Sequence, residues 1–371
     1  MNLHIVGMGW VTPLGAGVEE VWDLLLNGDT ASAELLSSPL GRAYPVCRVP
    51  ASALAKMPVH SRLRRSSAIS KFAAVTGLEA LANANVKLDP EKAKRTALIF
   101  AVSNGGVIYT KRFYHDIVES GAQAASPLLF PETVFNAPAS HLAAILGITG
   151  ATYTLVGDGA VGTLALKMAE DLMTSDALDY CLVVAAEEAD WLLCDAYRKW
   201  RLLRSAPPIE PFQQPPCGTV LSEGAGAVLL SMQGPAPSRP ISIQQISAGT
   251  NFSHQREAAA AVGKVFADLC HDDIARGAAD PPVVAASANG TFIDGAERAA
   301  IERHSPDARV YPVKQALGES VGASSLWQTI AAAQALITQK LPRQTVSTPL
   351  RNAIVSTCGL NQQAAGLRVS L

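Results

Sequence analysis

The chain of 371 residues lacks several features that would assign it to particular classes of protein. It has no block of basic residues and its formal net charge is −2, which argues against nucleic acid as a partner. No apolar run approaches the ~20 residues that span a bilayer, so we expect no membrane insertion. The first residues, MNLHIVGMGWVTPLG, lack the basic and apolar regions of a signal peptide. We therefore expect a cytoplasmic protein.

Paired cysteines are missing as well. The six cysteines are scattered singly, without a C-x-x-C pair or a Cys/His cluster at metal-ligand spacing. We therefore expect reduced thiols, no metal site and no cofactor. Apolar residues are plentiful, because hydrophobic residues make up 49% of the chain and charged residues 17%. This balance is typical of a globular protein with a large buried core.

The most informative segment is residues 151–173, ATYTLVGDGAVGTLALKMAEDLM. Its pattern predicts a strand, a turn of small residues at Gly157-Asp158-Gly159, and a helix. In nucleophilic enzymes such an elbow presents a Ser or Cys beside backbone N–H groups that stabilise an oxyanion. No residue from Val156 to Gly162 carries a hydroxyl or a thiol. Attack by a side-chain nucleophile at the apex is therefore excluded.

Predicted strands and helices alternate along the rest of the chain, which favours mainly parallel sheets covered by helices. No internal repeat is visible, and segments 31–60 and 191–216 read as irregular. Three prolines between residues 234 and 240 predict a boundary between an N-terminal half, 1–233, and a C-terminal half, 241–371. Helices are expected at 18–26, 66–86, 141–146, 164–172, 256–273, 296–304 and 324–338. Strands are expected at 3–8, 96–102, 151–156, 180–186, 227–231, 241–246, 283–286, 309–313, 352–357 and 366–371.

The letters of residues 157–162 also fit G-x-G-x-x-G between a strand and a helix, as in a dinucleotide-binding fingerprint. The next strand ends in Glu187-Glu188, where an acid could bind a ribose hydroxyl. That acid lies about 30 residues beyond the first glycine instead of about 20. A dinucleotide-binding or acyl-ligand-binding module therefore stays open as an alternative.

Six segments carry a resemblance that covers nearly the whole chain. In order they are VGMGWVTPLGAGVEEVWDLLLNG, TGATYTLVGDGAVGTLALKMAEDLM, PFQQPPCGTVLSEGAGAVLLSM, SANGTFIDGAE, KQALGESVGASSLWQTIAA and STCGLNQQAAGLRVSL. This series resembles the β-ketoacyl-acyl-carrier-protein synthases, which are condensing enzymes of the thiolase-like fold. The resemblance implies an α/β protein with five layers, α/β/α/β/α, built from two similar halves that each contain a mixed sheet. It also implies a dimer formed across the strand that enters the elbow.

The same resemblance identifies what is missing. In this family an elbow Cys carries the acyl chain as a thioester, and two histidines assist decarboxylation of the malonyl partner. The Cys position corresponds to Gly159, the first histidine position to Asn289 and the second to Glu319. Because a glycine cannot hold an acyl group, the resemblance implies a chain that cannot condense acyl units by itself. A carboxylate at 319 would also repel a developing enolate.

Other residues of the expected pocket fall into two groups. Lys314 matches the family's lysine, whereas Gln328 replaces an acidic residue and Ile293 replaces a threonine that contacts pantetheine. The family's Gly-Phe-Gly-Gly-Thr-Asn gate is replaced by residues 359–364, GLNQQA. The vestigial pocket is expected to contain Asp158, Thr291, Lys314, Cys358 and Leu360. Lys314 is expected to pair with Glu319 or Asp158, and Cys358 is either a core residue or a displaced nucleophile.

The resemblance favours a catalytically degenerate subunit that pairs with an active ketosynthase, as a chain-length factor does in fatty-acid, aryl-polyene or polyketide synthesis. Phe130 and Phe135 match the region that extends toward the partner's tunnel. A homodimer is the other possible assembly, and an acyl carrier protein is a possible partner for the arginines at 62, 64 and 65. A repurposed acyl-thioester hydrolase or acyltransferase that uses Asp158, Asn289 and Glu319 remains a further alternative.

Overall fold

A computed structural model describes residues 3–175, 177–234, 241–276, 281–360 and 363–371. Most strands join one 11-stranded sheet in the order β12-β11-β13-β14-β10-β1-β9-β7-β5-β6, with β2 paired to β1. These strands are β1 (Leu3–Thr12), β2 (Gly15–Ala16), β5 (Thr96–Val102), β6 (Thr152–Val156), β7 (Tyr180–Glu187), β9 (Gly224–Ser231), β10 (Ile241–Asn251), β11 (Val283–Ala285), β12 (Arg309–Tyr311), β13 (Asn352–Cys358) and β14 (Gln363–Ser370).

The order of these strands repeats. From β1 outward the N-terminal half runs β1-β9-β7-β5-β6, and from β10 outward the C-terminal half runs β10-β14-β13-β11-β12. In both halves the first two contacts are antiparallel and the last two are parallel. The two halves join where β1 pairs with β10 in antiparallel orientation. The halves are therefore similar in topology, although no repeat is visible in the sequence.

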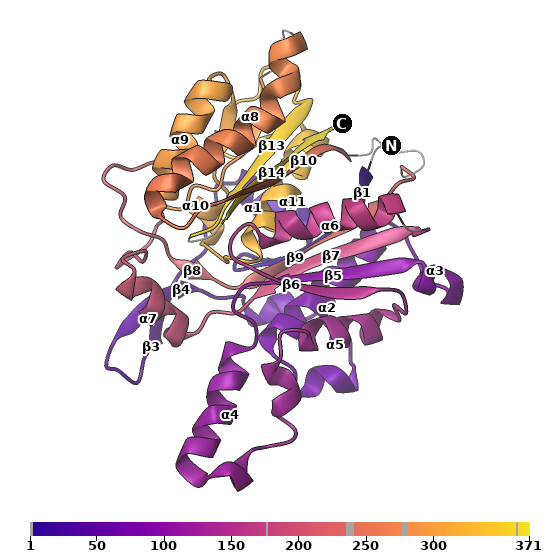
Figure 1. The fold of residues 1–371 in the computed structure, drawn as a ribbon, viewed down its shortest axis with the longest axis vertical. Helices are drawn as coiled ribbons and strands as arrows, with labels where there is room; N and C mark the ends of the chain where they lie inside the picture. The colour runs from indigo at the N-terminus through magenta and orange to yellow at the C-terminus, as the bar shows by residue number, and fades with distance from the viewer. Residues whose placement is uncertain (1–2, 176, 235–240, 277–280, 361–362) are drawn as a thin grey trace.

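Helices cover both faces of each half and complete five layers (Figure 1). On the outer face of the N-terminal half lie α2 (Ala68–Asn83) and α5 (Ala137–Leu146), and on the outer face of the C-terminal half lie α8 (Ala258–Arg276) and α9 (Ile293–His304). Between the halves lie α6 (Val161–Ser175) and α11 (Ser324–Thr338), which contact each other and strands of both halves. This is the expected thiolase-like arrangement.

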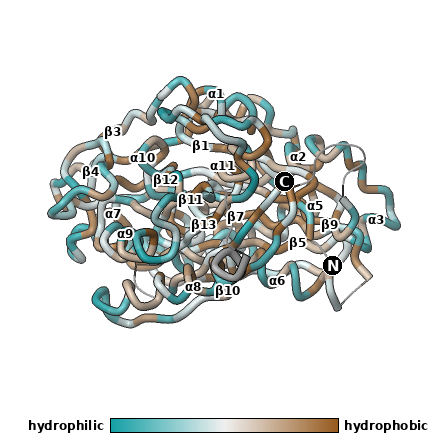
Figure 2. Tube along the Cα trace, turned by 90° about the horizontal axis from the view of Figure 1, so that it is seen from above, coloured by the Kyte–Doolittle hydropathy of each residue, from teal (hydrophilic) through white to brown (hydrophobic). Residues whose placement is uncertain are grey.

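The core follows from the apolar patterns. Every residue of β5, TALIFAV, is buried, as expected for a strand covered on both faces. The first 13 residues of α11 are buried because this helix is enclosed by both halves. Figure 2 shows hydrophobic residues along the central strands and hydrophilic ones on the outer loops. The predicted bounds of β5, α11 and α1 (Val18–Leu26) coincide with the observed ones.

Other predictions were wrong in detail. The sheet is mixed, as the resemblance implies, and is not mainly parallel, because β1, β9, β10 and β14 pair antiparallel with their neighbours. Segment 31–60 contains β3 (Glu34–Ser37) and β4 (Ala43–Cys47), which join β8 (Leu221–Ser222) in a second sheet. Segment 191–216 begins with α7 (Trp191–Lys199), whose N-cap is Asp190. Short strands and a capped nine-residue helix give weak periodic signals. Six of the seven residues of the predicted boundary at 234–240 lie outside the described residues.

One helix stands apart from the body. Helix α4 (Val107–Ser120) projects from the lower end of the molecule in Figure 1 and has no buried residue. It packs against the short helices η3 (Ala122–Ala124) and η4 (Phe130–Thr133). We call residues 107–135 the arm.

Candidate functional site

The elbow between β6 and α6 has the predicted strand–turn–helix form, with Gly159 buried in the turn two residues before the helix begins at Val161. A Cβ placed on Gly159 would lie 3.1 Å from the carbonyl oxygen of Cys358 and 3.3 Å from the Cα of Gly359. The Asp158 carboxylate occupies the space that a Cβ on Gly359 would need. The backbone after β13 is therefore pressed against the elbow, in the space a side chain at 159 would enter.

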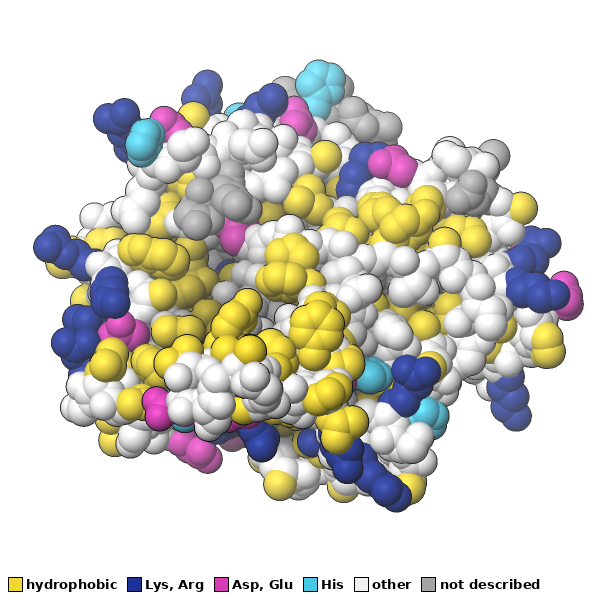
Figure 3. Space-filling view, turned by 60° about the horizontal axis from the view of Figure 1, so that its bottom comes forward, with side chains coloured by type: hydrophobic (Ala, Val, Ile, Leu, Met, Phe, Trp, Pro, Cys, Tyr) yellow, Lys and Arg dark blue, Asp and Glu magenta, His cyan; other side chains and the backbone are white. Residues whose placement is uncertain are grey.

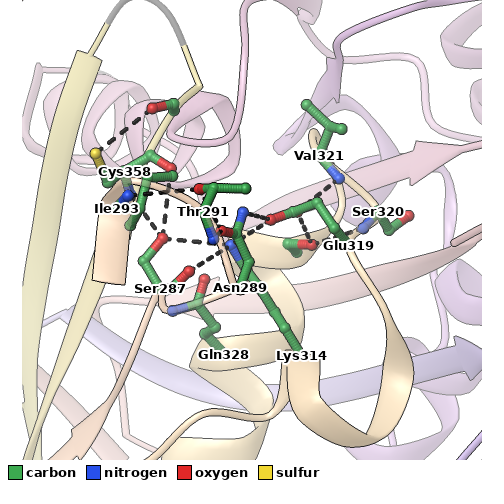
Figure 4. Close-up of polar contacts among 12 residues, drawn as sticks. Ser287, Asn289, Thr291, Ile293, Lys314, Glu319, Ser320, Val321, Gln328 and Cys358 are labelled. Atoms are coloured by element: carbon green, nitrogen blue, oxygen red, sulfur yellow. Dashed lines mark hydrogen bonds and ion pairs between the residues drawn. The ribbon is translucent and has the colours of Figure 1, made fainter. Parts of the chain in front are cut away.

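Glu319 lies at the centre of a buried polar network (Figure 4). Its Oε2 accepts hydrogen bonds from Lys314 Nζ at 2.8 Å and Asn289 Nδ2 at 2.7 Å. Its Oε1 accepts from the backbone N–H of Val321 at 2.9 Å and from Ser324 Oγ at 2.7 Å. Of the two predicted partners for Lys314, the pair with Glu319 is observed. Because four donors from the protein already occupy both of its oxygens, this carboxyl group is held by the fold and offers no free oxygen to a substrate.

Asn289 is fully buried and is committed to the same network. Its Oδ1 accepts from Thr291 Oγ1 at 2.6 Å and from the Thr291 N–H at 3.2 Å. Its own backbone N–H donates to Asp294 Oδ1 at 2.8 Å. Both ends of the Asn289 amide therefore have partners, and the side chain is held by its neighbours.

Cys358 is 2% exposed, and burial is the main cause that raises the pKa of its thiol. Its backbone N–H donates to Ser287 Oγ at 3.0 Å. Leu360, two residues further on, is also buried. Since buried cysteines with a raised thiol pKa are ordinarily unreactive, these observations favour the core-residue alternative for Cys358 over a displaced nucleophile. Residues 361–362 of the expected gate lie outside the described residues.

The sequence did not single out Ser287 and Ser324, although both organise the site. Lys314 Nζ donates to the Ser287 carbonyl oxygen at 3.1 Å and to Ser287 Oγ at 3.3 Å. Since Ser287 Oγ also binds the N–H of Cys358, it links the buried lysine to the backbone beside Gly159. Serines are common, and only their position after β11 and at the first turn of α11 distinguishes these two.

Gln328 and Ile293 are buried on α11 and α9. The Gln328 Nε2 donates to the carbonyl oxygens of Ala285 at 3.1 Å and Ser356 at 2.6 Å. Gln328 thus connects α11 to β11 and β13, and a carboxylate here would face two carbonyl oxygens.

Glu187 and Glu188, the acids expected of a dinucleotide site, are both buried. Glu187 is buried, and its carboxylate accepts from the backbone N–H groups of Ser103 and Asn104. Burial raises the pKa of Glu187 to about 8. Glu188 is also buried, at 3% exposure. Because both side chains are buried, neither acid is accessible to a ribose hydroxyl.

Phe130 and Phe135 lie in the arm and are 56% and 45% exposed. Phe130 packs against Phe113 with ring centroids 5.8 Å apart, and the Phe135 ring covers Gly105. Figure 3, which brings the lower end of the molecule forward, shows hydrophobic side chains gathered on this face. The arm therefore presents apolar surface that its own chain leaves uncovered.

Within the described residues, no group of three or more His, Cys, Asp or Glu side chains is arranged to hold a metal ion. The same part of the chain contains no helix that is both long enough and apolar enough to cross a membrane.

Comparison with known proteins agrees with this architecture. The family model for the beta-ketoacyl synthase N-terminal domain matches residues 2–235. Nodulation protein E of Rhizobium leguminosarum bv. trifolii is 24% identical over 354 residues, covering 90% of this chain and 85% of the relative. Among solved structures, the ishigamide ketosynthase/chain length factor superposes with a TM-score of 0.83 at 20% identity, covering 100% of this chain and 98% of the other.

A second solved structure, AntDE:AntF, is a type II polyketide acyl-carrier protein in complex with its ketosynthase bound to the hexaketide. It superposes with a TM-score of 0.84 at 17% identity and covers 100% of this chain and 99% of the other. Together with the repeated strand order, these likenesses define the class as a thiolase-like ketosynthase fold. The chain belongs to the beta-ketoacyl synthase family.

Proposed function

We propose that this chain is a non-catalytic subunit that pairs with an active ketosynthase in fatty-acid, aryl-polyene or polyketide synthesis, in the manner of a chain-length factor. The observation that carries this proposal is the filled elbow, by which we mean that the backbone of Cys358 and Gly359 lies against position 159. Gly159 offers no nucleophile, and the Cys358 carbonyl oxygen lies 3.1 Å from where its Cβ would be. At the two positions that correspond to the histidines, Asn289 and Glu319 bind each other.

The edge strand of the large sheet supports the proposed assembly with a ketosynthase. Strand β6 is the last strand on its side of the sheet, and its side chains include Tyr153 at 39% and Val156 at 55% exposure. An exposed edge strand with apolar side chains is a template for pairing with another chain. The arm adds Phe130 and Phe135 to this uncovered apolar surface. Clustered exposed apolar residues mark protein interfaces.

A carrier protein is the second proposed partner. The side chains of Arg62, Arg64 and Arg65 are exposed next to the start of α2, and no described carboxylate forms an ion pair with them. A cationic surface of this kind attracts an acidic protein and speeds its encounter.

The altered-enzyme alternative has less support. Glu319 is saturated by four donors and Asn289 by its own partners, so neither is poised to transfer a proton to a substrate. An acyl-thioester turnover assay should give no rate above background.

The test is co-expression with an intact ketosynthase, followed by light scattering and a chain-elongation assay. We expect a one-to-one complex, disrupted by Tyr153→Asp on β6 but not by the matched control Leu35→Asp on the distant strand β3. Phe130→Ala and Phe135→Ala should change product length without preventing assembly. A stable homodimer that ignores the ketosynthase would refute the proposal.

A further inference from the structure

The chain that enters the arm lies against the turn that carries Glu319. Residues 103–106 lead from β5 into α4, and we call them the neck. We call residues 319–323, which precede α11, the pocket turn. The ring of Phe135, at the other end of the arm, covers the neck, since a Cβ on Gly105 would lie 2.6 Å from this ring. Phe135 is 45% exposed, so a side chain on the surface touches the neck directly.

Glu187, the last residue of β7, holds the neck from inside the molecule. It is 2% exposed, and its carboxyl oxygens accept hydrogen bonds from the backbone N–H groups of Ser103 and Asn104. Because N–H groups that face the interior need an acceptor, this carboxyl group fixes the direction in which the chain leaves β5. Helix α4 has a fastening of its own, the 2.6 Å ion pair between Lys111 and Asp190. Glu187 therefore acts on the neck and not on α4 as a whole.

The same carboxyl group lies against the pocket turn. A Cβ on Gly322 would lie 2.5 Å from Glu187 Oε1 and 2.9 Å from the backbone nitrogen of Ser103. Val321 is buried and has a φ of 42°, a left-handed conformation that a branched residue seldom adopts. Its N–H donates to Glu319 Oε1 at 2.9 Å, which helps to hold this conformation (Figure 4). The pocket turn is therefore packed against the neck at Gly322 and held by Glu319 at Val321.

We propose that Glu187 couples the arm to the pocket. A change at the exposed Phe135 ring moves the neck, and Glu187 passes this movement through Gly322 to the pocket turn. Glu187 is a positioning residue, since it is buried and acts through the backbone of the neck. That the partner which covers Phe135 is a ketosynthase rests on the function proposed above. The coupling itself is a property of this chain and can be tested without a partner.

The first experiment measures hydrogen–deuterium exchange of peptides that cover the pocket turn, in the natural chain and in Phe135→Ala. This change removes an exposed ring, so the fold should be kept. Exchange in the pocket turn should become about twofold to thirtyfold faster, the range that single changes along a coupled network produce. The matched control is Phe130→Ala, since Phe130 is also an exposed ring of the arm but packs against Phe113 of α4. It should leave exchange in the pocket turn unchanged.

Coupling acts in both directions, so the pocket turn can be changed and the neck measured. The methyl group of Gly322→Ala would have to displace the Glu187 carboxyl group or the end of β5. Exchange of the neck should then rise severalfold. Gly295→Ala on α9 is the matched control, because a Cβ at this position meets no atom within 4 Å. The neck of this control should exchange at the natural rate.

The role of Glu187 is tested by asking whether it transmits the effect of Phe135→Ala. Glu187→Gln keeps an oxygen that accepts from the neck, so part of the response of the pocket turn should remain. Glu187→Met has no acceptor and should abolish the response. A merely structural Glu187 would change overall stability and leave the response in place. An undiminished response in Glu187→Met, or equal exchange of the pocket turn in natural and Phe135→Ala protein, would overturn the coupling.

The last experiment adds an intact ketosynthase. Binding that covers Phe135 should slow exchange of the pocket turn in the natural chain and not in Glu187→Met. Binding that leaves the pocket turn unchanged in the natural chain would overturn the link between docking and the pocket. If no ketosynthase binds, the proposed function fails, whereas the experiments without a partner still decide whether the coupling exists.

Discussion

The buried pair of Lys314 and Glu319 offers the sharpest test of the site. Their side chains are 1% and 3% exposed, with 2.8 Å between Nζ and Oε2. Glu319→Gln keeps the shape but removes the charge, and it turns an NH₂ either toward the donors Lys314 and Asn289 or toward the Val321 N–H and Ser324 Oγ. Breaking a buried ion pair by removing one partner costs about 3–5 kcal/mol. We expect the free energy of unfolding to fall by that amount.

The reverse change should cost less. Lys314→Met leaves Glu319 with three donors, from Asn289, Val321 and Ser324, so we expect a loss of about 2 kcal/mol. The double variant should lose less than the sum of the two, by about 1–3 kcal/mol, because it leaves no unpaired charge.

Equilibrium urea unfolding followed by circular dichroism measures all three values. Glu20→Gln is the matched control, since the Glu20–Lys56 pair is exposed and should contribute less than about 1 kcal/mol. Additive losses in the double variant, or a Glu319→Gln loss no larger than that of the control, would refute the network described above.

Three further predictions concern Gln328, the elbow at Gly159 and the cysteines. Gln328→Glu should destabilise the fold by about 3 kcal/mol or more, and Gln328→Met by less, because a carboxylate would face the two carbonyl oxygens that now accept from Nε2; urea unfolding compares them. Gly159→Cys should react with a maleimide far more slowly than exposed Cys217 and restore no chain elongation, because the Cys358 backbone crowds position 159; labelling of the variant as fast as Cys217 would contradict the filled elbow. In the natural chain at pH 8, mass spectrometry should find Cys217 alone labelled without denaturant, since the other five cysteines are buried.

Much of the fold could be predicted because strong apolar patterns coincide with elements that are buried on all sides. β5 and α11 are such elements, and their bounds were predicted correctly. Helix α4 was not predicted, since its apolar residues are uncovered in the chain and form no buried stripe. The strands that pair antiparallel were predicted, but their pairing was not, because the contact between β1 and β10 joins residues far apart in sequence, which local patterns do not report.

The candidate site likewise has a part that could be predicted from the sequence and a part that could not. The sequence identified Asn289, Lys314 and Glu319 as neighbours only through a family resemblance, and the structure brings them within hydrogen-bond distance. The saturation of Glu319 could not be predicted, because two of its donors are a backbone N–H and Ser324, which only the turn before α11 brings there. The contact between the elbow and the backbone after β13 likewise depends on tertiary packing.

The repeated strand order gives the pocket a symmetry of its own. Helices α6 and α11 each follow the third strand of their half, so the elbow and the turn that holds Glu319 are the same structural position used twice. Each helix start carries a partial positive charge of about half a unit. Asp158 precedes one start, and Glu319 binds the other through Val321 and Ser324. A carboxyl group of this chain therefore lies at the start of each of the two helices, in the position that an acyl oxyanion would take.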